Sequence, residues 1–161
     1  MLIKTQGEFH LNTIKWYFKN VYKVEVETFV PKVPYRETIS GEAEAEYTHR
    51  KQSGGAGQYG KVELRVMHND EEDFVYETNI FGGSISQQFL PSIEKGIRQV
   101  LEEGVIAGYP VGQVKVVVFD GKMHPVDSKD IAFQIAGREA FKIAFNKANP
   151  ALLEPIMNVK V

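Results

Sequence analysis

The middle of the chain alternates polar and apolar residues, which is the period of strands that expose one face to water. Glutamates alternate with alanines and a tyrosine from Glu42 to Tyr47, and apolar residues recur at every second position from 62 to 66. A third run follows an acidic turn, and a fourth is rich in β-branched residues, as is typical of a covered central strand. The pattern predicts strands over 42–47, 62–66, 74–80 and 114–119.

Two later segments carry apolar residues at helical spacing. The first begins at Pro91 and is closed by Gly104, and its predicted buried stripe is Ile93, Ile97, Val100 and Leu101. The second covers 130–147, with Asp127 or Ser128 as its expected cap and Pro150 as its stop. Its expected inward residues are Ile131, Ile135, Phe141 and Ala144, with Gly137 and Ala140 allowing close packing on the sheet. These elements predict an α/β (α+β) domain in which two helices cover a mixed sheet.

The first thirty residues predict an incomplete unit. Apolar residues at helical spacing from Leu11 to Val21 predict a helix, and the alternating run 23–28 predicts a strand. One helix and one strand cannot cover each other's apolar surfaces in isolation. Pro31 and Pro34 then predict an extended linker. We therefore interpret residues 1–30 as the tail of a neighbouring domain. A further strand is predicted over 156–161.

Composition narrows the class of protein. Of the 161 residues, 43% are apolar and 25% are charged, the balance of a globular chain that can bury a sizeable core. A net charge of −2 excludes a uniformly basic coat for nucleic acid but leaves room for local basic loops. The absence of cysteine excludes disulfides, thiolate zinc sites and cysteine nucleophiles. No apolar run approaches the length of a membrane span, and a cytoplasmic location is predicted.

The stretch QSGGAGQYG at 52–60 carries four glycines in nine residues, interleaved with amides, a hydroxyl and Tyr59. His49, Arg50, Lys51 and Lys61 flank it with positive charge. This mixture suits a flexible contact with nucleic acid, because cations meet phosphates while amides and a ring meet bases or sugars. The alternative is a long hairpin turn whose glycines only satisfy backbone geometry.

The same stretch contains a false match to a phosphate-binding loop. Residues 55–61 fit its first seven positions, but Val62 stands where a hydroxyl should hold magnesium. The alternating pattern that follows predicts a strand, whereas a phosphate-binding loop leads into a helix. We therefore reject nucleotide binding at this loop.

A second candidate loop is DGKMHPVDS at 120–128, between a predicted strand and a predicted helix. Lys122 and His124 are expected to be exposed there. A histidine with a nearby aspartate suits acid–base catalysis, but no nucleophile with a matching role accompanies the pair. The four histidines of the chain, His10, His49, His68 and His124, share no metal-ligand spacing.

Taken together, these segments resemble bacterial translation elongation factor G. The resemblance is carried in order by YRET, the glycine-rich stretch, EKGI, GYPV, DG, His124, VDS, IAG and LEPIM, at 35–38, 52–60, 94–97, 108–111, 120–121, 124, 126–128, 135–137 and 153–157. It implies that residues 1–30 end the ferredoxin-like third domain, 31–41 form a linker and leading strand, 42–154 the fourth domain, and 155–161 the start of the fifth. The implied fold is that of the second domain of the fifth small-subunit ribosomal protein, with a left-handed βαβ crossover.

The resemblance also implies a role. In this family the fourth domain reaches the decoding region of the small ribosomal subunit, and two tip loops contact the tRNA and mRNA during translocation. His124 occupies the position of the diphthamide of eukaryotic and archaeal counterparts. The residues implied to contact RNA are Gln52, Ser53, Gly54, Gly55, Gly57, Gln58, Tyr59, Lys61, Lys122, His124, Pro125 and Asp127. No cofactor is expected in this chain, which is expected to be a monomeric piece of a GTPase that uses GTP and magnesium elsewhere.

The chain departs from the family pattern at its tip. Met123, Pro125, Lys129 and Lys61 replace the Tyr, Asp, Ser and His that bacterial members commonly carry. These departures keep a specialised paralogue, for ribosome recycling or a particular growth state, as an alternative. A ribosome-protection relative is disfavoured by the glycine-rich loop, and an independent enzyme by the lack of a nucleophile–base pair.

Overall fold

The computed structural model describes residues 3–52, 55 and 57–156. Its backbone divides into two compact units, 1–33 and 34–161. The domain identities that the family resemblance implies for the segments of the chain stay a prediction.

In the unit 1–33 the predicted helix is confirmed, and the predicted strand is wrong. Helix α1 covers Glu8–Asn20 and has no buried residue. Residues 23–30 form no strand, and Lys23 has a positive φ of 58°. A strand needs a backbone partner for its hydrogen bonds, and no ladder forms with this segment in the described part of the unit. Apolar side chains of α1 and of residues 26–31 instead line a hollow of about 640 Å³.

In the unit 34–161 the four predicted strands are confirmed, and they form one mixed sheet. The strands are β2 (Glu42–Lys51), β3 (Gln58–His68), β4 (Phe74–Thr78) and β5 (Val114–Lys122), in the order β2-β3-β5-β4. Neighbours are antiparallel except β4 and β5, which are parallel. Strand β5 runs three residues into the predicted loop, because Lys61 pairs with Lys122 and Val62 with Gly121.

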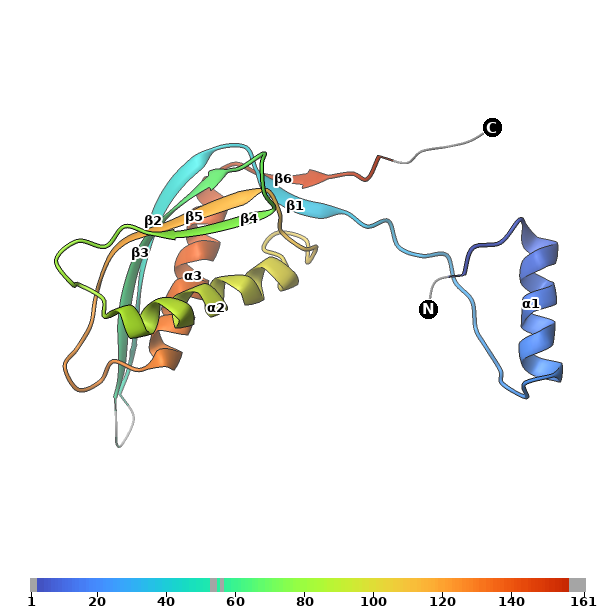
Figure 1. Ribbon diagram of the computed structural model, residues 1–161, viewed down its shortest axis with the longest axis horizontal. Helices are drawn as coiled ribbons and strands as arrows, with labels where there is room; N and C mark the ends of the chain where they lie inside the picture. Colours follow the sequence, from blue (N-terminus) through green and yellow to red (C-terminus); the bar gives the residue numbers. More distant parts are fainter. Residues whose placement is uncertain (1–2, 53–54, 56, 157–161) are drawn as a thin grey trace. The chain divides into compact units, whose positions relative to one another are not determined.

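Two helices complete the domain and confirm the predicted fold class. A short 3-10 turn η1 (Gln87–Phe89) leads into α2 (Leu90–Glu103), and α3 covers Asp130–Lys147. Figure 1 shows both helices lying against the same face of the sheet. The core between the helices and the sheet holds alternate valines of β3 and β5 and three phenylalanines of α3. The elements β4, α2 and β5 form the parallel crossover, whose left-handed sense stays a prediction.

Three details of α3 differ from the prediction. Ile131 is 43% exposed, and the next two residues, Ala132 and Phe133, are buried in its place. Neither Asp127 nor Ser128 caps the helix, because Lys129 holds the cap position without a side-chain hydrogen bond. The atoms nearest to Gly137 belong to Ile93 of α2, so the small residue serves the contact between the helices.

The domain also contains a second sheet, which has two strands. It pairs β1 (Arg36–Ile39) with β6 (Pro150–Leu153) in antiparallel register. Pro150, the expected stop of the helix, is also the first residue of β6. The strand predicted over 156–161 is not seen at Ile156, and residues 157–161 lie outside the described residues.

Glu37 of β1 is a charged residue that lies in the buried interior of the domain. Its side chain is fully buried, and its two oxygens accept hydrogen bonds from the backbone N–H groups of Val105, Ile106, Ala107 and Tyr109 at 2.6–3.1 Å. The carboxylate therefore anchors the loop that joins α2 to β5.

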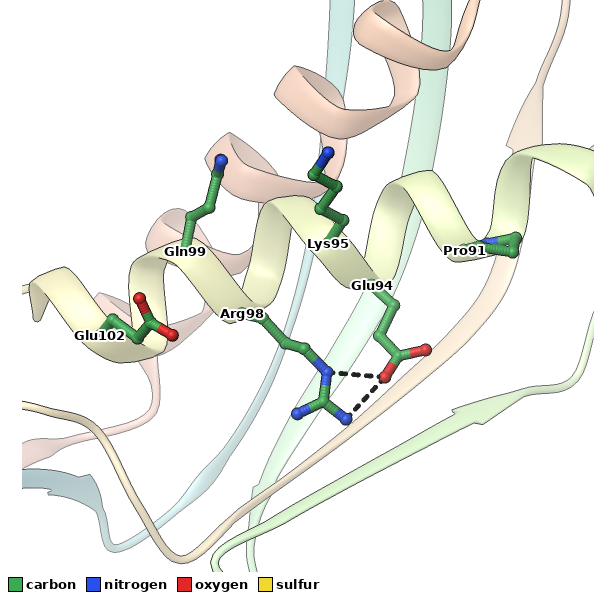
Figure 2. A pocket seen from close by; sticks show the side chains of 6 residues that line it. All are labelled: Pro91, Glu94, Lys95, Arg98, Gln99 and Glu102. Atoms are coloured by element: carbon green, nitrogen blue, oxygen red, sulfur yellow. Dashed lines mark hydrogen bonds and ion pairs between the residues drawn. The ribbon is translucent and has the colours of Figure 1, made fainter.

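The sheet face that the helices leave open carries ion pairs. Lys61 lies 2.7 Å from Glu46 and 2.8 Å from Glu63, Arg65 pairs with Glu42, and Lys115 pairs with Glu77. These pairs balance acidic and basic side chains on the open face. Another mixed-charge surface lies on α2, where Arg98 and Glu94 are 2.7 Å apart beside a shallow hollow of about 400 Å³ (Figure 2). No residue of the two candidate loops lines that hollow.

Candidate nucleic-acid interface

The two candidate loops meet at one end of the mixed sheet. The first, 52–57, joins β2 to β3, and the second, 123–129, joins β5 to α3; we call them together the tip (Figure 1). The backbone N–H of Tyr59 donates to the carbonyl of Asp127 at 2.9 Å, and Tyr59 forms a parallel bridge with Ser128. Residues almost seventy positions apart are thus held side by side. Ser53 and Gly54 lie outside the described residues.

Two glycines, Gly57 at the end of the first loop and Gly60 in β3, let the backbone approach the rest of the domain closely. A Cβ on Gly57 would lie 2.8–2.9 Å from the carboxylate of Asp127, and one on Gly60 would lie 3.2–3.3 Å from Ala132 and Phe133. Because β2 and β3 are paired in antiparallel register on either side of it, the first loop is a hairpin connection, as the simpler interpretation predicts. Its glycines do more than satisfy turn geometry, however, because Gly57 makes room for the second loop.

The imidazole of His124 has a defined place in the second loop. Its Nδ1 accepts the backbone N–H groups of Val126 at 3.3 Å and Asp127 at 3.2 Å. The carboxylate of Asp127 lies 3.7 Å from the same nitrogen, and the ring of Tyr59 is 6.1 Å away between centroids. The side chain is 49% exposed, which confirms the expected exposure of this residue.

Ser128 joins the second loop to β3. Its hydroxyl oxygen accepts the backbone N–H of His124 at 2.8 Å, and the hydroxyl donates to the carbonyl of Tyr59 at 3.1 Å. With its proton on that carbonyl, the hydroxyl is not activated by the imidazole as a serine nucleophile would be. The sequence suggests Ser128 only as a helix cap. Its role depends on a distant strand, so no local signal could have revealed it.

The positive charges of the tip differ in how they are paired. Arg50, Lys51, Lys122 and Lys129 take part in no ion pair within the described residues. Lys61, by contrast, is directed to Glu46 and Glu63 of the open face, and hydrogen bonds to these carboxylates raise its pKa. The structure therefore pairs the side chain of Lys61 with acidic side chains, although its backbone lies opposite that of Lys122 in the sheet.

The remaining candidate residues lie around this centre. The side chain of Gln58 contacts His49 Nε2 at 3.0 Å, which ties the two strands together below the first loop. Gln52, Gly55, Lys122 and Pro125 are exposed. The structure thus brings Gly57, Tyr59, His124 and Asp127 into contact, and Gln52, Gly55, Gln58, Lys122 and Pro125 lie near them along the chain.

Other chemistry finds little support in the described part of the chain. No group of three or more histidine, aspartate or glutamate side chains there could hold a metal ion. Lys61 and Val62 lie within β3, so the strand that argued against a phosphate-binding loop is confirmed. Within the ranges described, none of the helices has the length and apolar character that crossing a membrane requires.

Comparison with known proteins assigns this domain to the translation elongation factors. The family model described as "Elongation factor G, domain IV" matches residues 31–149. The chain therefore belongs to the elongation factor G domain IV family.

Curated relatives agree over nearly the whole chain. "Elongation factor G 1" of Syntrophus aciditrophicus (strain SB) is 49% identical over 160 residues, which are 99% of this chain and 23% of that protein. "Elongation factor G 2" of Vibrio cholerae serotype O1 is 44% identical, with the same coverage of both chains. A crystal structure of a Thermus thermophilus protein is 46% identical with a TM-score of 0.83 and covers 91% of this chain and 22% of its own. The chain thus spans about a quarter of the length of its curated relatives.

Proposed function

We propose that this domain promotes the translocation of tRNA and mRNA by inserting its tip at the decoding region of the small ribosomal subunit. The observation that carries the proposal is the joining of the second tip loop to β3, directly after the first loop, through Tyr59, Asp127 and Ser128. A loop held to the sheet in this way presents one fixed arrangement of donors to an RNA partner. A loop without such a link would have to be ordered on binding, at an entropic cost.

The charge distribution supports an RNA partner. Arg50, Lys51, Lys122 and Lys129 surround the tip, while Glu42, Glu46 and Glu77 lie on the open sheet face. A chain of net charge −2 can in this way present local positive charge to phosphates. The polar, glycine-bearing loops add donors for sugars and bases.

The wider protein supplies the energy for this step in the proposal. We expect it to bind GTP and magnesium outside this chain, to act on the ribosome in the cytoplasm, and to need no cofactor within residues 1–161. The tip of this domain acts in the proposal as a non-catalytic contact to rRNA, tRNA and mRNA.

The proposal is tested with a complete elongation factor G that carries this chain as its fourth domain. In that factor His124→Ala is expected to slow single-turnover translocation at least tenfold while ribosome-stimulated GTP hydrolysis stays within twofold, because the tip lies outside the GTPase domain. His68→Ala is the matched control, since His68 is a histidine of β3 that bonds Asp70 and takes no part in the tip. Equal losses of both activities, or a fall in melting temperature of His124→Ala beyond that of the control, contradict the proposal.

A role in ribosome recycling is a second candidate. It is favoured by the exposed Pro125 beside His124, where the family commonly carries aspartate. The two functions separate in paired assays of the same factor, one for translocation and one for the splitting of post-termination ribosomes. A factor that splits ribosomes but does not translocate them supports the second candidate.

A further inference from the structure

We infer that the tip presents His124 to its RNA partner as an oriented hydrogen-bond donor, through Nε2–H, and that Ser128 is the positioning residue that holds it there. The inference rests on the proposed function and deepens it. It states that the group which meets His124 on the RNA is a hydrogen-bond acceptor.

The hydrogen bonds of the imidazole decide which ring nitrogen carries the proton. Nδ1 of His124 faces the backbone N–H groups of Val126 and Asp127, at 3.3 and 3.2 Å. A ring nitrogen that accepts hydrogen bonds carries no proton, so this network assigns the single proton of the neutral ring to Nε2. In a side chain that is 49% exposed, Nε2 is then left as a donor only.

The side chains of Asp127 and Tyr59 face the imidazole ring. Asp127 is the charged group of the same loop, 3.7 Å from Nδ1, and from β3 the neutral ring of Tyr59 faces it at 6.1 Å. The main chain of Asp127 is fixed by its bond to Tyr59, and its carboxylate lies against Gly57. The acceptor side of the imidazole therefore points to the protein, and this arrangement comes from the second loop and from β3.

The Ser128 hydroxyl holds the second loop in position. The Ser128 hydroxyl holds the backbone N–H of His124 and the carbonyl of Tyr59 at the same time, at 2.8 and 3.1 Å. The N–H of Ser128 closes the turn on the carbonyl of His124 at 3.3 Å. Without the hydroxyl, the backbone of His124 loses its link to β3 through Ser128, and only the bond between Tyr59 N–H and the carbonyl of Asp127 still ties this loop to the strand. The direction of Nε2–H is then set less firmly by the sheet.

The proton is located by nitrogen-15 NMR of the 161-residue chain at neutral pH, away from the ribosome. We expect the His124 proton on Nε2 in the parent chain and in Ser128→Thr, which keeps the hydroxyl, and a mixture of tautomers in Ser128→Ala. Ser40→Ala is the matched control, because the Ser40 hydroxyl also donates to a backbone carbonyl, that of Asn149, at the far end of the domain. A proton on Nδ1 in the parent chain overturns the inference.

The positioning role is tested by a double-mutant cycle in the complete factor. Ser128→Ala is expected to slow translocation by about three- to tenfold, the effect of one net hydrogen bond, when His124 is present. In the His124→Ala background the same substitution is expected to change the rate by less than about twofold. Ser128→Thr should restore the parent rate, and Ser40→Ala should leave it unchanged.

The outcomes separate this inference from the function it rests on. If His124→Ala does not slow translocation, the proposed function fails. If His124→Ala does slow it but Ser128→Ala costs the same in both backgrounds, Ser128 acts only on the fold. The positioning inference alone is then overturned.

Discussion

Replacing Glu37 by glutamine tests how the base of the domain is held. The fully buried carboxylate satisfies four backbone donors of the loop between α2 and β5, two on each oxygen. Glutamine has nearly the same shape but a single acceptor oxygen. Its amide group would turn N–H donors toward two of the four backbone N–H groups, which would be left without an acceptor.

The magnitude follows from those two donors. Each buried donor left unsatisfied costs about 1–3 kcal/mol, so Glu37→Gln is expected to lower the free energy of unfolding by about 2–6 kcal/mol. This is a large part of the roughly 5–15 kcal/mol that is typical of a folded domain. Glu71→Gln is the matched control, because Glu71 is exposed. A surface substitution of this kind is expected to change the stability by about 0.5 kcal/mol or less.

The assay is urea unfolding followed by circular dichroism, because Trp16, the single tryptophan, lies in α1 and does not report on this domain. A loss below about 1 kcal/mol at pH 7 would refute the anchoring role. Burial raises the pKa of Glu37, but the four backbone N–H donors outweigh it, and the net pKa lies below the ordinary 4.5. The stabilisation is thus complete above pH 4.5 and is lost as the pH falls through the lower, folded pKa. The gap between parent and variant should narrow over that window.

Substitutions of Gly57, Gly96 and Lys122 test two close contacts and one unpaired charge of the domain. Gly57→Ala should force the Asp127 carboxylate aside and so slow the translocation that the complete elongation factor carries out. The melting temperature of the chain should change little, since the contact is with a partly exposed side chain. Gly96→Ala should lower the unfolding free energy by about 1–3 kcal/mol in urea titrations, because its Cβ would meet a backbone carbonyl of α3. Lys122→Ala should reduce the log–log salt dependence of ribosome binding by about 0.7–0.9, and the ion-paired Lys115→Ala should not. An unchanged translocation rate, an unchanged urea midpoint and equal slopes, respectively, would contradict these predictions.

The sheet and the two covering helices were predictable because their signals are local. Alternation marks β2 and β3 on the sequence, and Pro91 and Gly104 mark the ends of α2 to within a residue. The face of α3 was harder to predict. Apolar residues occur nearly all round this helix, so Ile131 was a plausible inward residue until the packing against α2 and the sheet selected its neighbours.

Elements that depend on distant partners were not predictable. Strand β6 exists because β1 pairs with it, and its first residue is a proline, which favours the interpretation of a helix stop. The false strand at 23–28 is the converse, a strand pattern without a ladder partner in the described chain. At the tip the sequence indicated both loops and His124. The link through Ser128 arises only when β3 and the second loop come together, and the ion pair of Lys61 with Glu46 arises only when β2 pairs with β3.

The location of the tip on the ribosome is the most direct test of the proposed function. The chain contains no cysteine, so a single cysteine at Val126, whose side chain is 79% exposed, can carry a hydroxyl-radical source in a complete factor freed of other cysteines. With Val126→Cys we predict cleavage of small-subunit rRNA at the decoding region in the state trapped during translocation. The same source at Glu71 should give none there. Cleavage at the decoding region from position 71 but not from 126, or from neither, would contradict the account.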